Sequence, residues 1–506
     1  MTGSRSKNVS LNTIFALSCQ AFNLLINFIT RTVFIKVLGT EYLGVNGLFT
    51  NVLTILSFAE LGIGNAIVFN LYKPLAVGDK LKIGSLMALY KKAYTMIGLF
   101  VAITGLGLTP LLGVIIKKAP DIPENISVLY NLFLANTVVS YFFAYKKNII
   151  IAEQKNYIVL IVTQVVNVAK IIFQIIFLFV THQYIIYLII QIICTITENI
   201  ICYIVADKLY PYLKDPVVPL NKEETSEIIK DVKALALYKF GSVILNGTDN
   251  ILISSMIGVR EVGLVSNYVL LTTSCSSILN KVTEAFTSSV GNLNATSDPG
   301  KQYEVFKKLL FITVWIYGFA SVGLILVSQS FITTWLGRDY LLEMPVLIAI
   351  VAEFYVKGVH SVAYTYRSTL GFFVEGRWSA LAAAVINLVL SIILCQRIGL
   401  AGIFIATPIA RMLSIGIVDP VLIFRKGFKK NVAEYYVTYF GYFILFVAIV
   451  FGCKMILDWI NISGWIGVII NAITVTVVFN SIVISIFGRT KMFKELQQTF
   501  LKIITK

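Results

Sequence analysis

The stretch IGVIINAITVTVVFNSIVISI, residues 466–486, contains no Asp, Glu, Lys or Arg and is rich in isoleucine and valine. It is 21 residues long, and a helix needs about 20 mainly apolar residues to cross a bilayer. Runs of the same kind, such as residues 171–180, recur along nearly the whole chain, which is 57% hydrophobic. The sequence therefore predicts an all-α polytopic membrane protein and excludes a soluble globule.

The apolar runs predict about fourteen transmembrane helices joined by short connections. The first run is too long for a signal-peptide core and carries Arg31, so we expect it to remain as the first membrane helix. The predicted spans are residues 12–36, 43–71, 93–116, 126–150, 157–181, 184–206, 236–258, 262–290, 308–333, 343–369, 376–396, 399–424, 435–457 and 463–487.

The formal net charge of +16 is explained by where the basic residues fall between these spans. Most Lys and Arg of the predicted loops lie on the side that carries both termini, which predicts a cell-membrane protein with cytoplasmic termini. Nucleic-acid binding is not needed to explain the charge. The six cysteines lie singly, without CxxC spacing, so we expect neither disulfides nor a bound metal. Without a Walker loop or a nucleophile elbow, we expect no cofactor and no enzymatic reaction.

A short repeat indicates an internal duplication. Gly39-Thr-Glu-Tyr-Leu-Gly44 and Gly258-Val-Arg-Glu-Val-Gly263 share Gly-x4-Gly spacing 219 residues apart, and Asn27 and Asn246 match at the same offset. Six spans separate the copies, so we predict two parallel six-helix lobes with a cavity between them. The predicted parts are an N-terminal lobe (1–207), a cytoplasmic linker (208–233), a C-terminal lobe (234–425), and an extra helix pair with a basic cytoplasmic tail (426–506).

Charged residues in the middle of apolar spans are the candidate functional residues. A charge at membrane depth costs at least about 2.5–3.5 kcal/mol, so it faces a partner or a water-filled cavity. Four cations of this kind indicate a cavity for an anion: Arg31, Lys281, Lys357 and Arg411.

Several of these residues belong to polar stripes on single helix faces. Span ten carries Glu353, Lys357, His360, Tyr364 and Arg367 at 4-3-4-3 spacing, which places them on one face. Span eight has a similar stripe with Lys281 and Glu284, span one has Asn27 and Arg31, and span seven has Asn246 and Asp249. The alternative is that the charges only neutralise one another within a helix, as in pairs of Glu353 with Lys357 and Lys281 with Glu284.

Two segments resemble a known family. They are GTEYLGVNGLFTN at residues 39–51, continuing as AELGIGNAIVFNLYKPLA at 59–76, and TDNILISSMIG at 248–258, followed by VGLVSNY at 262–268. These segments are similar to Gram-positive polysaccharide repeat-unit flippases, in the polysaccharide transporter branch of the multidrug/oligosaccharidyl-lipid/polysaccharide exporter superfamily. With the span pattern, the resemblance covers about residues 8–425.

The resemblance implies an alternating-access flippase that moves undecaprenyl-diphosphate-linked oligosaccharide from the inner to the outer leaflet for capsule or exopolysaccharide assembly. Membrane lipid, a polysaccharide polymerase and glycosyltransferases are the partners it implies. The predicted diphosphate- and sugar-binding residues are Arg31, Lys281, Lys357, Arg411, Asn27, Asn246, Tyr364 and Arg367.

Three other functions remain open at this point. A cation-coupled multidrug exporter of the same superfamily would use Asp249, Glu284, Glu353 and His360 as ion sites, although buried bases disfavour cationic cargo. A lipid II flippase would move a chemically similar diphosphate. A non-transporting scaffold for polysaccharide synthesis would leave the polar stripes without a role.

Overall fold

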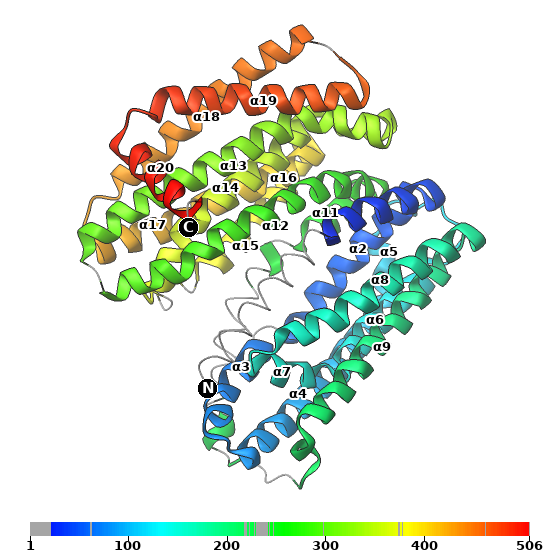
Figure 1. The fold of residues 1–506 in the computed structure, drawn as a ribbon. Helices are drawn as coiled ribbons and strands as arrows, with labels where there is room; N and C mark the ends of the chain where they lie inside the picture. Colours follow the sequence, from blue (N-terminus) through cyan, green and yellow to red (C-terminus); the bar gives the residue numbers. More distant parts are fainter. Residues whose placement is uncertain are drawn as a thin grey trace. The chain divides into compact units, whose positions relative to one another are not determined.

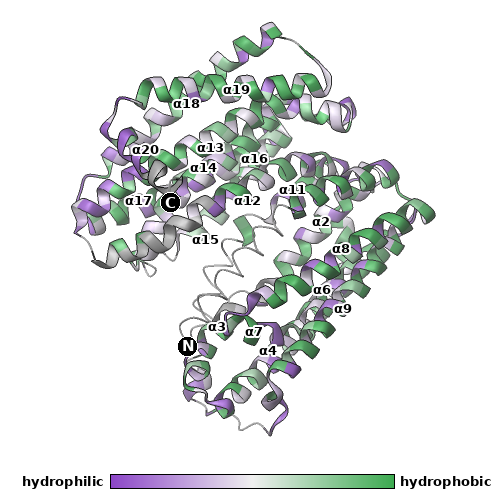
Figure 2. Cartoon of the chain, in the orientation of Figure 1, coloured by the Kyte–Doolittle hydropathy of each residue, from purple (hydrophilic) through white to green (hydrophobic). Residues whose placement is uncertain are grey.

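A computed structural model describes residues 22–504 apart from 61–62, 217–219, 222, 227, 229–240, 242, 246, 297, 373–374, 377 and 461. The described residues are almost entirely helical and include no strand. Among them, ten helices are long and apolar enough to cross a membrane, or eleven if one bent pair is a single span. Apolar residues cover most of the length of these helices (Figure 2). The predicted all-α multi-pass class is confirmed, and the number fourteen stays a prediction.

The chain divides into two compact units, Met1–Gly263 and Leu264–Lys506. The first unit begins with a helix over residues 22–38. Its next helices are α2 (Thr40–Leu56), α3 (Ile63–Val77), α4 (Lys80–Leu108), α5 (Leu112–Ile115), α6 (Ile126–Tyr141), α7 (Lys147–Ala152), α8 (Asn156–Thr181), α9 (Tyr184–Leu209) and α11 (Asp249–Met256). Helix α12 (Val259–Thr296) begins in this unit and continues into the second.

The second unit is built from long helices that run alongside one another (Figure 1). They are α13 (Pro299–Trp335), α14 (Met344–Thr369), α15 (Ser379–Ile398), α16 (Leu400–Leu413), α17 (Ile415–Leu422), α18 (Ala433–Ile460), α19 (Gly464–Phe487) and α20 (Lys491–Ile504). A π-helical turn, Ile423–Phe428, continues α17.

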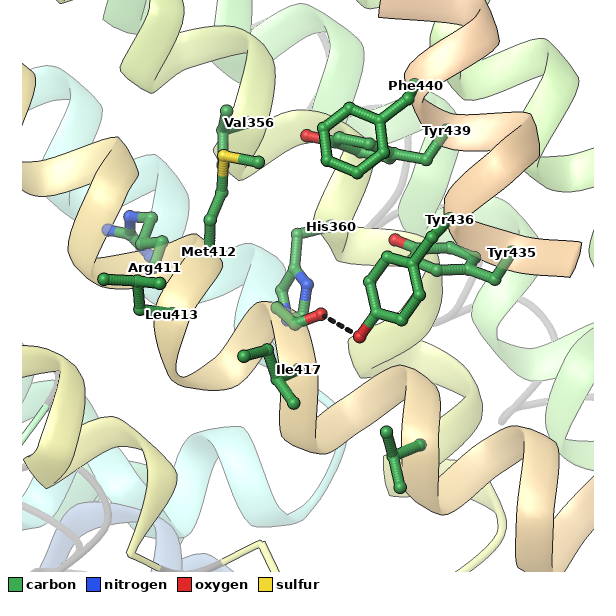
Figure 3. Close-up of a pocket in the computed structure, with 12 residues that line it drawn as sticks. Val356, His360, Arg411, Met412, Leu413, Ile417, Tyr435, Tyr436, Tyr439 and Phe440 are labelled. Carbon is green, nitrogen blue, oxygen red and sulfur yellow. Dashed lines mark hydrogen bonds between the residues drawn. The ribbon is translucent and has the colours of Figure 1, made fainter. Parts of the chain in front are cut away.

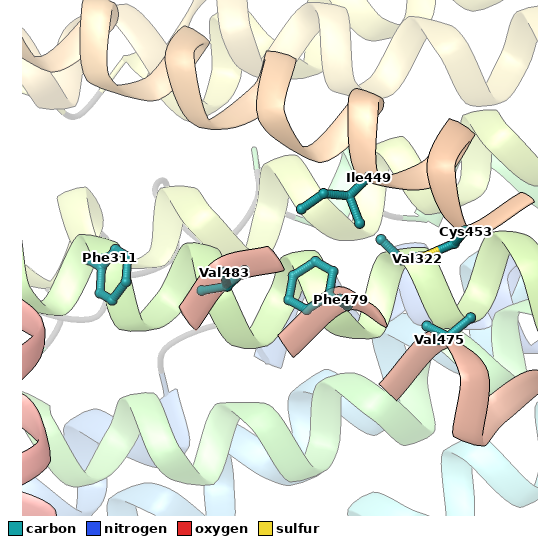
Figure 4. Close-up of a cluster of buried hydrophobic side chains, with 7 residues drawn as sticks. All are labelled: Phe311, Val322, Ile449, Cys453, Val475, Phe479 and Val483. Atoms are coloured by element: carbon teal, nitrogen blue, oxygen red, sulfur yellow. The ribbon is translucent and has the colours of Figure 1, made fainter. Parts of the chain in front are cut away.

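Helices α18 and α19, the predicted extra pair, pack against α13. Their shared apolar cluster consists of Phe311, Val322, Ile449, Cys453, Val475, Phe479 and Val483 (Figure 4). Helix α20 folds back onto the same surface, where Phe493 stacks on Trp315 with ring centroids 5.6 Å apart. The last two spans are therefore anchored to α13 by apolar burial.

The described part of the predicted linker lies against the start of α4. Lys80 lies over the ring of Tyr212, 5.7 Å from its centroid. Lys82 forms an ion pair with Glu224, and its hydrogen bond lowers the pKa of the Glu224 carboxyl group.

Some of the predicted spans are not single α-helices. Span 43–71 is divided between α2 and α3, span 126–150 bends by 43° between α6 and the residues from 144 onward, and span 399–424 breaks at Ser414. An interrupted helix leaves backbone carbonyls without partners, which lipid cannot supply.

At the bend after α6, side chains of α9 supply these partners. The side-chain amide of Asn199 donates to the carbonyl oxygens of Val139, Ser140 and Phe142 at 3.3, 3.3 and 3.1 Å. Phe143 adopts a left-handed backbone with φ 68° at the 43° bend between α6 and the residues that follow. Lys146 then pairs with Asp207, also on α9.

Beyond the break at Ser414, a proline leaves one backbone carbonyl of α17 without its helical donor. Pro420 has no N–H to donate to the carbonyl of Gly416, four residues earlier. The hydroxyl of Tyr436, on α18, donates to that carbonyl instead, at 3.2 Å. A side chain from the extra helix pair therefore satisfies a carbonyl that the α16–α17 span cannot satisfy itself.

The repeated glycine motifs contact each other within the first unit. A Cβ atom at Gly44 would clash with the Val259 carbonyl, and one at Gly263 would clash with the Thr40 carbonyl. Each copy of Gly-x4-Gly thus supplies a glycine that lets the starts of α2 and α12 meet backbone to backbone.

We predict that Gly44→Ala destabilises the protein by about 1–3 kcal/mol because the added methyl group overpacks this crossing. Thermal unfolding of the purified protein in detergent measures the effect. Gly107→Ala on α4 is the control, since a Cβ there meets nothing within 4 Å. Equal melting temperatures for the two variants would show that the crossing does not need glycine.

Candidate functional site

A buried carboxylate, Asp419 on α17, organises the polar residues of the second unit. Asp419 is 1% exposed. Arg367 Nη1 lies 2.8 Å from Oδ1, and His360 Nε2 lies 2.9 Å from Oδ2. Both partners come from α14, so Asp419 ties α17, beyond the Ser414 break, to α14.

Arg367 has further structural contacts. The guanidinium also lies 3.4 Å from the Gly376 carbonyl and 3.4 Å from the Ser379 hydroxyl, and its side chain is 3% exposed. A guanidinium that is buried and bound to a carboxylate is poorly accessible to a ligand. The geometry therefore gives this predicted substrate-binding residue a structural role.

A second group of charged side chains, Glu353 and Lys357 of α14 with Arg411 of α16, is arranged differently. Arg411, on α16, has Nη2 3.9 Å from Glu353 Oε1, which is a loose ion pair across two helices. Lys357 interacts electrostatically with both groups. Its side chain is exposed, and no carboxylate of the described residues lies within 4 Å of its ammonium. These three side chains carry two positive charges and one negative, so the group is net positive.

Arg411 and His360 both line a cavity of about 400 Å³ (Figure 3). Its other walls are mainly apolar and aromatic, with Tyr436 and Tyr439 contributed by α18. The cavity therefore places the Arg411 guanidinium next to apolar and aromatic side chains, while His360 is already bound to Asp419.

In the first unit, Arg31 is half-buried on the 22–38 helix and interacts with the Tyr187 hydroxyl of α9. On the same helix, the side-chain oxygen Oδ1 of Asn23 accepts a hydrogen bond of 3.1 Å from the side-chain amide of Gln164 on α8. The role of Arg31 as a substrate-binding residue stays a prediction.

This unit also contains a charged cluster that the sequence analysis did not select. The Glu198 carboxylate accepts bonds from the ammonium of Lys147 at 2.7 Å and from the hydroxyl of Thr163 at 2.9 Å. Lys170 of α8 interacts electrostatically with the same carboxylate. Lys170, Glu198 and Asp419 all stand as isolated charges in apolar runs, the signal that selected Arg31 and Lys357.

The remaining predicted residues fall into three groups. Asn27, Lys281 and Tyr364 are exposed, and the Tyr364 ring lies 5.3 Å below the Arg367 guanidinium carbon. Asp249 is half-buried at the start of α11 in the first unit. Asn246 and the side chain of Glu284 lie outside the part of the chain that is described.

A family model described as polysaccharide biosynthesis protein matches residues 9–286, more than half of the chain. The chain belongs to this family. The membership confirms the family that the glycine-containing motifs predicted. No curated protein sequence matches the chain.

Solved structures share the fold of this family member. The lipid II flippase MurJ, in an inward closed conformation, is 17% identical and covers 94% of this chain and 100% of its own, with a TM-score of 0.65. An inward-facing multidrug resistance MATE transporter is 15% identical over 82% and 96% of the two chains, with a TM-score of 0.62. The MATE multidrug transporter DinF-BH is 18% identical, and the match covers 83% of this chain and 96% of that transporter, with a TM-score of 0.57.

We predict that Asp419→Leu costs about 3–5 kcal/mol because it leaves the buried Arg367 without its counter-charge. The double variant Asp419→Leu/Arg367→Leu should recover part of this loss. Thermal unfolding in detergent provides both values.

The control is Glu375→Gln, which removes an exposed ion pair with Lys426 and should change stability by less than about 1 kcal/mol. If the double variant were as unstable as the sum of the two single variants, the pair would not be the source of the stability.

Proposed function

We propose that this protein is a flippase that moves undecaprenyl-diphosphate-linked oligosaccharide repeat units from the inner to the outer leaflet for capsule or exopolysaccharide assembly. The observation that carries the proposal is the net-positive group of Lys357, Arg411 and Glu353 on α14 and α16. A cation kept in a membrane span without a close carboxylate is stabilised when it meets an anionic ligand.

The chemistry of a lipid diphosphate matches this group. Arg411 presents a planar guanidinium that can contact two phosphate oxygens, and Lys357 adds a flexible ammonium. In the first unit, Arg31 and the amide of Asn27 offer a cation and a hydrogen-bonding group of the same chemistry. The neighbouring Arg367 and His360 would hold α14 and α17 in place through Asp419.

No nucleotide is required for outward movement. An inside-negative potential favours the exit of each negative charge by about 2.3 kcal/mol per 100 mV. The proposal therefore includes a chain in the cytoplasmic membrane with cytoplasmic termini, an alternating-access cycle and no catalytic reaction.

A second candidate is a lipid II flippase. The match to MurJ over 94% of this chain favours it as an alternative substrate class. Both candidates use a polyprenyl diphosphate, so both require Lys357 and Arg411 to bind a diphosphate, and they differ in the group attached to it.

We predict that Lys357→Gln slows transport on the order of tenfold to a hundredfold, the loss expected for one charge-assisted hydrogen bond. The assay uses liposomes containing the full chain and a fluorescent polyprenyl-diphosphate oligosaccharide, whose outer-leaflet fraction is followed by chemical quenching. Lys301→Gln, at an exposed position in the first turn of α13, is the matched control.

Parallel assays use lipid II and a cationic dye. Transport of the oligosaccharide lipid that depends on Lys357 supports the proposal. Transport of the dye alone, or no transport of any of the three, would contradict it.

A further inference from the structure

A second cavity lies at the end of the second unit where α13 and α18 finish and α19 begins. Its volume is about 430 Å³, within the range of about 300–1,000 Å³ typical of small-molecule pockets. It shares no lining residue with the cavity at Arg411. Five polar side chains from three helices face it: Gln329, Ser330, Lys454, Asp458 and Asn471.

One of these side chains is held rigidly. Gln329 accepts a hydrogen bond of 2.7 Å from the buried Tyr268 hydroxyl and donates one of 2.8 Å to the Leu342 carbonyl. Because both ends of the amide are fixed, its second N–H is held in a defined direction at the cavity wall.

Two other side chains have bonding capacity to spare. Asn471 of α19 and Ser330 of α13 are joined only by a long contact of 3.4 Å. Asn480, two and a half turns along the same helix, behaves differently. It accepts from the Trp315 indole at 3.0 Å and donates to the Thr476 carbonyl at 2.8 Å. Asn480 thus joins helices, as polar residues commonly do in membranes, whereas Asn471 borders the cavity with most of its donors and acceptors uncommitted.

The charged residues at this cavity neutralise each other. Lys454 Nζ lies 2.7 Å from Asp458 Oδ2, one turn along α18, and both side chains are more than half exposed. The cavity therefore presents no net charge, in contrast to the group at Lys357. Its remaining donors and acceptors are amides and a hydroxyl, next to apolar side chains such as Ile325 and Leu457.

We propose that this cavity binds a neutral glycosyl headgroup. A sugar offers hydroxyls that both donate and accept, together with an apolar C–H face, which matches mixed amide, hydroxyl and aliphatic walls. The headgroup could come from a glycolipid of the membrane or from the sugar part of the transported lipid. Only the second source rests on the proposed function. In either case the extra helix pair supplies part of a binding site that the six-helix repeat lacks.

The experiment places a photoreactive benzoylphenylalanine at Leu457 in the full chain. The protein is reconstituted in phosphatidylcholine vesicles that contain diglucosyl diacylglycerol, sugar-free diacylglycerol, phosphatidylglycerol or the polyprenyl-diphosphate oligosaccharide. Mass spectrometry then measures the adducts formed on irradiation. We expect glycosylated lipids to give the main adduct, and Asn471→Ala to reduce it about three- to tenfold, the effect of one or two lost hydrogen bonds.

Asn480→Ala is the matched control on the same helix. It should lower the melting temperature, because two good hydrogen bonds are lost, and leave the adduct yield unchanged. Asn471→Ala should do the reverse. If Asn471→Ala lowered only the melting temperature, Asn471 would be a helix contact and the proposal would be wrong.

The lipid arms separate the possible outcomes. Equal adducts with sugar-free diacylglycerol or phosphatidylglycerol would overturn the proposal, because sugar would then not be recognised. An adduct with the diglucosyl lipid in a protein that transports nothing supports this site and rejects the proposed function. An adduct with the oligosaccharide lipid alone supports the site and identifies its ligand as the transported sugar.

Discussion

The structure depends on one constraint: in lipid, each buried charge and each unpaired carbonyl must find its partner inside the protein. Asp419 meets this constraint with Arg367 and His360. The carbonyls at two interrupted spans meet it with the Asn199 amide and the Tyr436 hydroxyl. Every one of these partners comes from another helix. The breaks in the spans and the packing of the helices therefore determine each other.

The same constraint separates structural charges from functional ones. The Asp419 group is compact, buried and bound on both carboxylate oxygens, so it stabilises the junction of α14 and α17. The group of Lys357, Arg411 and Glu353 is looser, more exposed and net positive. A membrane protein retains such an excess charge only where a ligand or water compensates for it. This contrast, within a single helix face, is the physical basis of the proposal that the substrate is anionic.

The sequence was sufficient for the fold class and for the polar face of α14. Apolar runs of about 20 residues indicate transmembrane helices directly. The residues at 4-3-4-3 spacing from Glu353 to Arg367 all lie within one continuous helix, α14, so they share one face. The Gly-x4-Gly repeat was also visible, although its two copies gave no sign that they contact each other. The break at Ser414 could not be predicted, since Pro420 lies six residues beyond it, inside α17.

The partners of the charged residues could not be predicted. Arg411 is 58 residues from Glu353, and Asp419 is 52 from Arg367, so each pairing depends on tertiary packing rather than helical periodicity. For this reason Arg367 was grouped with the ligand-binding cations, and the ion pairs of Glu198 were not anticipated.

The most direct test of the central claim is an experimental structure of the full chain with the polyprenyl-diphosphate oligosaccharide bound. The account predicts a phosphate oxygen within hydrogen-bond distance of the Lys357 ammonium, with Arg367 still paired to Asp419. A diphosphate bound away from Lys357, with that ammonium held against a carboxylate, would contradict it.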